Sequence, residues 1–132
     1  MRSMLFAVGM FATSLVVGGA LAQTATPEAM PTVTVESSRQ VNTTIERGRV
    51  PVVRVSLSYT VTAQGVDLTS KAGAQEFEKR VSDAAMAACK ELGTKYPGST
   101  PDDAQCAKAA TADAMAKVHV LEAAAAMNKG GK

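Results

Sequence analysis

The chain has 132 residues, of which 46% are hydrophobic, 4% aromatic and 20% charged, and its formal net charge is +2. This length has room for one domain. A charge so close to neutral excludes recruitment to nucleic acid or to an anionic membrane by net charge alone. With no tryptophan, the core must come from Val, Leu, Met and Ala, so we expect a thin core that needs a covalent staple.

The first segment of the chain, residues 1–22, has the pattern of an export signal. Arg2 precedes an apolar run over residues 4–17, and Ala20-Leu21-Ala22 is the small-x-small pattern that signal peptidase recognises. We expect cleavage between Ala22 and Gln23 and a periplasmic mature protein, whose net charge falls from +2 to +1 when Arg2 is lost. An uncleaved anchor is the alternative, because the apolar segment is just long enough to span a bilayer.

Residues 23–31 lack periodicity and are expected to be a flexible leader before a single domain over residues 32–128. Val33 and Val35 alternate with polar residues, which predicts a strand over residues 32–36. Ser37-Ser38-Arg39 is then expected to be a turn. A weaker alternation follows at Val41, Thr43 and Ile45, and a second turn is expected at Arg47-Gly48-Arg49.

The clearest strand pattern follows Pro51. Apolar residues share one face of this strand and polar residues the other, which predicts an antiparallel strand with one buried face; the apolar positions are Val53, Val55, Leu57, Tyr59, Val61 and Ala63. Gly65 is expected to end the strand.

Two amphipathic helices are expected after the sheet. The first spans Ser70 to Leu92, with Gly93 at its C-cap. The second spans Pro101 to Met127, with the Thr100 hydroxyl as its cap and a disordered tail over residues 129–132. The predicted fold is therefore α+β: a small antiparallel sheet of two or three strands packed on an antiparallel two-helix hairpin.

The two cysteines are placed to join these helices. Cys89 lies beside the apolar stripe of the first helix, and Cys106 begins the stripe of the second. A structural disulfide between them is favoured over two reduced thiols, and over a redox-active pair, which usually has C-x-x-C spacing.

His119 is the only histidine, so any catalysis that uses an imidazole must pass through it. It precedes Glu122 by one helical turn, so both side chains could touch one metal ion, although two ligands make a weak site. A solvated helix histidine is the alternative. Asp102 and Asp103 are interpreted as charges at a helix start rather than as calcium ligands.

Four arginines, Arg39, Arg47, Arg49 and Arg54, gather on the predicted sheet. They are compatible with an envelope protein or an anionic envelope component as partner, or with a charged strand edge that prevents aggregation. The Ala-rich end of the second helix, residues 123–127, could pack on another copy in a homo-oligomer or within one chain.

No phosphate loop, nucleophile elbow, zinc-ligand set or dinucleotide fingerprint is present in the sequence, so no cofactor is expected. We expect a non-enzymatic periplasmic protein, with a binding, envelope-associated or stress-related role. The alternatives are a small periplasmic hydrolase or thiol redox enzyme that uses His119 or the cysteines, and a weak metal-binding protein.

Several short motifs recur in a characteristic order after the signal segment: Val33-Thr-Val-Glu36, Val55-Ser-Leu-Ser58, Val66-Asp-Leu-Thr69, Ala72-Gly73, Phe77-Glu-Lys-Arg-Val81, Ala84-Ala85, Cys89-Lys-Glu-Leu92, Tyr96-Pro97 and Cys106-Ala-Lys-Ala-Ala110. In this order, with the cysteines bracketing Tyr-Pro, the chain resembles the UrcA family of small exported proteins of Gram-negative bacteria, over about residues 33–124. The resemblance implies a periplasmic location and no established activity.

The sequence departs from that family at one point. The family usually has Tyr-x-Asp-Leu-Asp-Leu before the first helix, whereas this chain has Ala63-Gln-Gly-Val-Asp-Leu68. The tyrosine and the first acid are thus replaced by Ala63 and Gly65. A binding feature that uses them in relatives would be missing here.

Overall fold

The computed structural model describes residues 30–42 and 52–131. The expected signal segment 1–22, the cleavage site between Ala22 and Gln23, most of the leader, and the expected turn at Arg47-Gly48-Arg49 lie outside the described residues.

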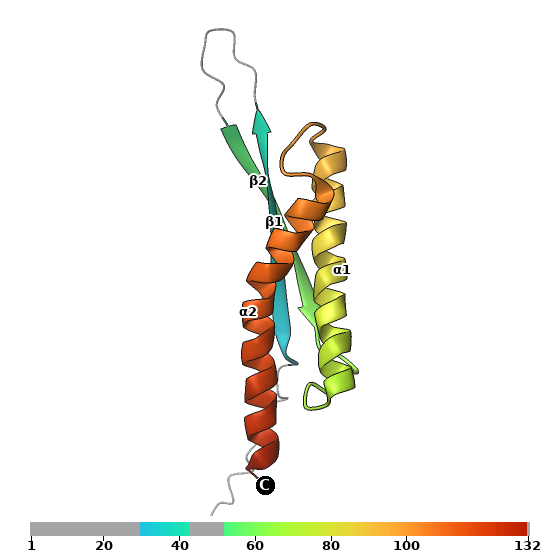
Figure 1. The fold of residues 1–132 in the computed structure, drawn as a ribbon, viewed down its shortest axis with the longest axis vertical. Coiled ribbons are helices and arrows are strands. Elements are labelled where there is room, and N and C mark those ends of the chain that lie inside the picture. Colours follow the sequence, from blue (N-terminus) through green and yellow to red (C-terminus); the bar gives the residue numbers. More distant parts are fainter. Residues whose placement is uncertain (1–29, 43–51, 132) are drawn as a thin grey trace, which may run out of the picture.

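Two strands and two helices make one α+β unit (Figure 1), with β1 at Thr32–Asn42, β2 at Val52–Thr62, α1 at Lys71–Lys95 and α2 at Asp103–Gly130. The strands pair antiparallel, and the two helices run in opposite directions against them. α1 contacts both strands, whereas α2 contacts β1 and α1. This confirms the predicted fold class, with two strands in the described part of the sheet.

The sheet has two different faces, because successive side chains along each strand point to opposite faces. Val33 pairs with Val61, and Val35 pairs with Tyr59, on the face that the helices cover. Val33 and Val35 are buried, whereas Thr34 between them is exposed. The opposite face is mainly Ser and Thr, as expected for a sheet with one face in water.

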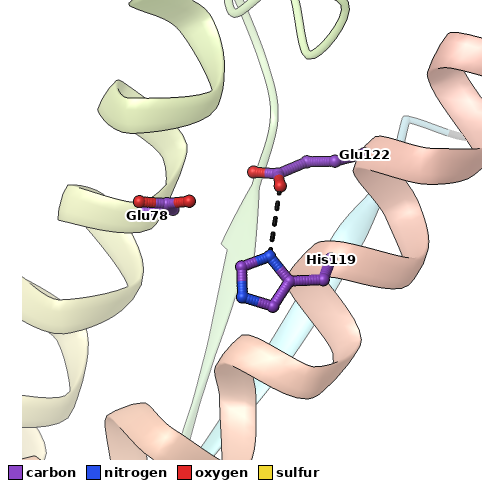
Figure 2. Close-up of side chains that lie close together, drawn as sticks. All are labelled: Glu78, His119 and Glu122. Carbon is purple, nitrogen blue, oxygen red and sulfur yellow. Dashed lines mark hydrogen bonds and ion pairs between the residues drawn. The ribbon is translucent and has the colours of Figure 1, made fainter. Parts of the chain in front are cut away.

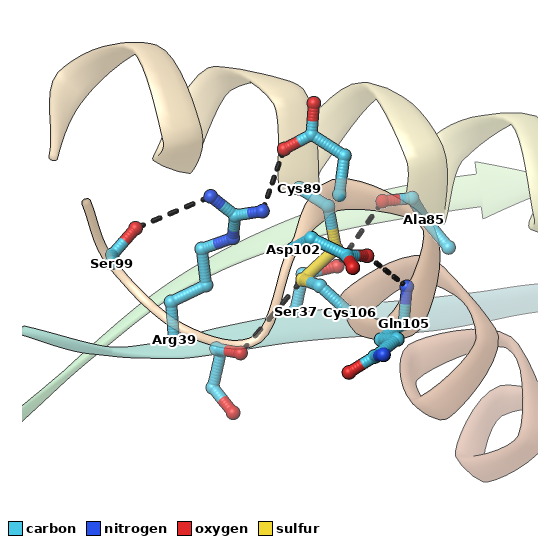
Figure 3. Close-up of a disulfide and its surroundings, with 10 residues drawn as sticks. Ser37, Arg39, Ala85, Cys89, Ser99, Asp102, Gln105 and Cys106 are labelled. Atoms are coloured by element: carbon cyan, nitrogen blue, oxygen red, sulfur yellow. Dashed lines mark hydrogen bonds and ion pairs between the residues drawn. A yellow bond between two sulfur atoms is a disulfide. The ribbon is translucent and has the colours of Figure 1, made fainter. Parts of the chain in front are cut away.

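The predicted turn at Ser37-Ser38-Arg39 is wrong, because β1 continues through these residues. Ser37 and Arg39 are buried on the helix-covered face. The Ser37 hydroxyl donates to the Ala85 carbonyl at 3.4 Å. Arg39 donates to Ser99 at 3.2 Å (Figure 3) and to Asp103 at 2.6 Å. These polar residues therefore belong to the core face, where other elements supply their partners.

α1 forms because an apolar residue recurs every third or fourth position, and its buried residues are Phe77, Val81, Ala85, Ala88, Cys89 and Leu92. Ser70 caps its start, accepting a hydrogen bond from the Gly73 amide at 3.0 Å. The helix does not end at Gly93 as expected. A Cβ at Gly93 would lie 2.6 Å from Nη1 of Arg39 and 2.8 Å from Oδ1 of Asp103, so this glycine makes room for an ion pair.

α2 begins later than expected. Asp102 is its N-cap and accepts a hydrogen bond from the Gln105 amide at 2.9 Å. Thr100, the expected cap, instead exchanges backbone hydrogen bonds with Gln40 at the outer side of β1. The helix continues to Gly130, into the segment 129–132 for which the sequence predicted disorder.

A disulfide joins the two helices between Cys89 and Cys106, with 5.9 Å between their Cα atoms (Figure 3). Cys89 is completely buried and Cys106 is 2% exposed. The bond therefore lies inside the core, at the end of the helix pair where the interhelical loop turns back.

Replacing both cysteines, as Cys89→Ala/Cys106→Ala, should lower the free energy of unfolding. The bond closes a segment with a sequence separation of 17, which the chain-entropy relation values at about 3 kcal/mol. Urea unfolding monitored by circular dichroism measures the loss. A reductant should lower the midpoint of the native protein and leave that of the variant unchanged; equal midpoints for native and variant would contradict a stabilising bond.

The Asp103→Ala variant should lose about 1–3 kcal/mol of stability, because it leaves the buried guanidinium of Arg39 without its charged partner. Arg39 is 4% exposed and Asp103 47% exposed. The matched control is Asp83→Ala, which breaks the solvent-exposed pair with Lys79 and should cost no more than about 1 kcal/mol. Urea midpoints compare the two variants, and an equal loss would show that burial of Arg39 carries no energetic weight.

The Tyr59 hydroxyl joins β2 to α1 by donating to Glu91 at 2.7 Å, and this hydrogen bond raises the pKa of Tyr59 above its usual 10.0. The stabilisation is fully present below pH 10.0 and is lost as the pH rises through the folded-state pKa. In a Tyr96→Phe background, ultraviolet titration reports Tyr59 alone. Tyr59 should ionise at higher pH than in the same background carrying Glu91→Gln, and superimposable curves would rule out this contact.

Candidate metal centre

Two carboxylates and the imidazole meet between the helices (Figure 2). Glu78 comes from α1, and His119 and Glu122 come from α2. One potential ligand atom of each residue lies within 4.8 Å of the other two. Nδ1 of His119 is 3.3 Å from Oε2 of Glu122. The structure thus adds a third ligand to the pair that the sequence identified.

The core sets the positions of these side chains. Glu78 directly follows Phe77, and His119 directly follows Val118; both Phe77 and Val118 are completely buried. Glu78 and His119 therefore lie at the rim of the helix interface, beside anchored residues. Glu122 lies one turn beyond His119 on the same helix, a spacing that places side chains next to each other.

The electrostatics of the cluster favour a cation. Among the described residues, Lys79 pairs with Asp83, and Arg80 pairs with Glu76. Neither Glu78 nor Glu122 forms an ion pair with a lysine or arginine there. Oε1 of Glu122 is buried without a hydrogen-bond partner among those residues. Two carboxylates in such proximity repel each other, and an unpaired buried oxygen is costly. A bound cation would relieve both penalties.

Carboxylate oxygen and imidazole nitrogen are ligands for Zn²⁺ and similar divalent transition metals. With ligand bonds of about 2.0–2.2 Å, any two of these ligand atoms that lie as far apart as the 4.8 Å limit would have to move closer on binding. The His119 side chain is 64% exposed. Remaining coordination positions would therefore be open to water.

The prediction that four arginines gather on the sheet is wrong for Arg39. Arg39 is buried and paired with Asp103, whereas Arg54, paired across the strands with Gln40, lies on the opposite face of the sheet. Arg47 and Arg49 lie outside the described residues. An open hollow of about 750 Å³ beside Arg39 is lined by Lys90 and also by Asp102 and Asp103, so cations and carboxylates balance there.

Ala63 and Gly65 lie in the turn after β2. Ala63 is 7% exposed and packs in the core. Gly65 has a φ of 71°, a left-handed conformation that favours glycine. Alanine and glycine at these two positions thus fit a packed strand end and a tight turn.

Comparison with models of known families, with curated proteins and with solved structures finds no match to this chain. Among the helices that the structure describes, none combines the length and the apolar character needed to cross a membrane. Geometry and side-chain chemistry therefore carry the functional conclusion.

Proposed function

We propose that this protein is an exported, non-enzymatic periplasmic protein that binds a divalent transition-metal ion between its helices through Glu78, His119 and Glu122. The observation that carries the proposal is the buried, unpartnered Oε1 of Glu122 in a cluster of two carboxylates and one imidazole. A metal ion would add positive charge beside two carboxylates that have no lysine or arginine partner among the described residues.

Export is supported by the signal pattern of residues 1–22 and by the disulfide, since such bonds persist in oxidising compartments. The order of the motifs supports membership of the UrcA family. Because Arg39 is paired internally with Asp103, we assign binding to the metal cluster rather than to an anionic envelope component.

A role without catalysis is supported by the surroundings of the reactive residue types. The cysteine sulfurs are buried in a disulfide, whereas redox-active cysteines need access to their substrates. The imidazole of His119 faces carboxylates instead of a serine or cysteine nucleophile. A cation-binding site, by contrast, needs only the carboxylate oxygens and the imidazole nitrogen that this cluster contains.

Calorimetric titration of the untagged protein with Zn²⁺ should give one binding site. The variants Glu78→Gln, His119→Ala and Glu122→Gln should each weaken binding at least tenfold, which corresponds to about 1.4 kcal/mol. Glu76→Gln is the matched control, because Glu76 lies on the same helix and pairs with Arg80 outside the cluster. This control should bind as the native protein does.

Two results would reject the proposal. One is a flat titration of correctly folded native protein with Zn²⁺, Mn²⁺ and Co²⁺. The other is Zn²⁺ binding that is unchanged in Glu78→Gln, because the site needs a ligand from each helix. Circular dichroism of every variant shows that the fold is retained.

A further inference from the structure

The outer edge of β2 differs from the outer edge of β1. Along β1, Thr100 pairs with Gln40, and α2 packs against the strand. Beside β2, over residues 52–62, the structure places no further strand in the described ranges. This edge contains no proline, and its only charged residue is Arg54. Such an edge is a template for the addition of another strand.

The backbone groups that this edge offers follow from the pairing of the strands. The Ala63 amide donates to the Pro31 carbonyl at 2.9 Å, one step beyond the Thr32–Thr62 pair. The N–H and C=O of a residue in an antiparallel pair point to the same side, and this side alternates along the strand. The odd-numbered residues of β2 therefore bond to β1, and the even-numbered residues present their backbone groups at the open edge.

We propose that a second copy of this chain occupies the edge, with the two β2 strands antiparallel about a two-fold axis at Leu57. In this register all residues of β2 find a partner. On the helix-covered face, Val53 lies opposite Val61 and Val55 opposite Tyr59, while Leu57 meets its own copy.

The other face of the strand is equally self-complementary. Arg54 lies opposite Thr60, and Ser56 lies opposite Ser58, so no like charges meet. A register centred on Arg54 would instead place two guanidinium groups together. Because strand pairing also covers Val53, which is 46% exposed in one chain, the product is a symmetric dimer with a continuous four-stranded sheet.

Substitutions that each add one cysteine to β2 test the register between the two β2 strands by cross-linking. Leu57→Cys should form a covalent dimer with oxidised glutathione, because residues opposite each other in a non-hydrogen-bonded pair have Cβ atoms about 4.5–5.5 Å apart. Val55→Cys is the matched control and should stay uncross-linked, because it faces Tyr59 of the other copy. Cross-linking of Val55→Cys but not of Leu57→Cys would overturn the register.

Sedimentation velocity with Ser58→Pro tests the edge itself. The Ser58 amide points to the open edge, so proline removes an intermolecular donor without breaking a bond to β1. This variant should sediment as a monomer with a native circular dichroism spectrum, while Ser58→Ala remains a dimer. A monomeric native protein at all concentrations tested, or a Ser58→Pro dimer joined through the Ala-rich end of α2, would overturn the proposal.

Discussion

The bond between Cys89 and Cys106 fixes the place where α1 meets α2, and the rest of the structure depends on that meeting. A two-stranded sheet with one buried face can cover little apolar surface, so the helices must also pack on each other. Among the described residues the core consists mainly of valine and alanine, with Phe77 as its only aromatic residue. A covalent link compensates for this small core and keeps the helix pair in one register.

The same end of the molecule also contains a buried charge. Arg39 of β1 forms an ion pair with Asp103, in the first turn of α2. Gly93 leaves the space that this ion pair occupies. The loop is thus held by the disulfide, by the ion pair and by the pairing of Thr100 with Gln40. These contacts fix one end of the hairpin, whereas Glu78, His119 and Glu122 lie toward the other end.

The sequence predicted what depends on local periodicity, and it failed where partners come from distant elements. Both helices and the apolar face of β2 follow from spacing alone. Ser37 and Arg39 were predicted as a turn because their polarity suggests solvent, whereas α1 and α2 supply their partners. Gly93 was predicted as a C-cap because glycine commonly follows the last residue of a helix. Its role is visible only when Arg39 and Asp103 are placed beside it.

The candidate site shows the same division. His119 and Glu122 were paired from their spacing on one helix, whereas Glu78 was missed because its position depends on the register between two helices. That register could have been estimated by counting along both helices from the disulfide, which places Glu78 toward the beginning of α1 and Glu122 toward the end of α2.

X-ray absorption spectroscopy of the Zn²⁺-loaded protein identifies the atoms that bind the metal ion. We expect a first shell of nitrogen and oxygen at about 2.0–2.2 Å, with the multiple-scattering signature of a single imidazole and no sulfur. A spectrum with sulfur ligands at about 2.3 Å, or one without any imidazole, would contradict binding at Glu78, His119 and Glu122.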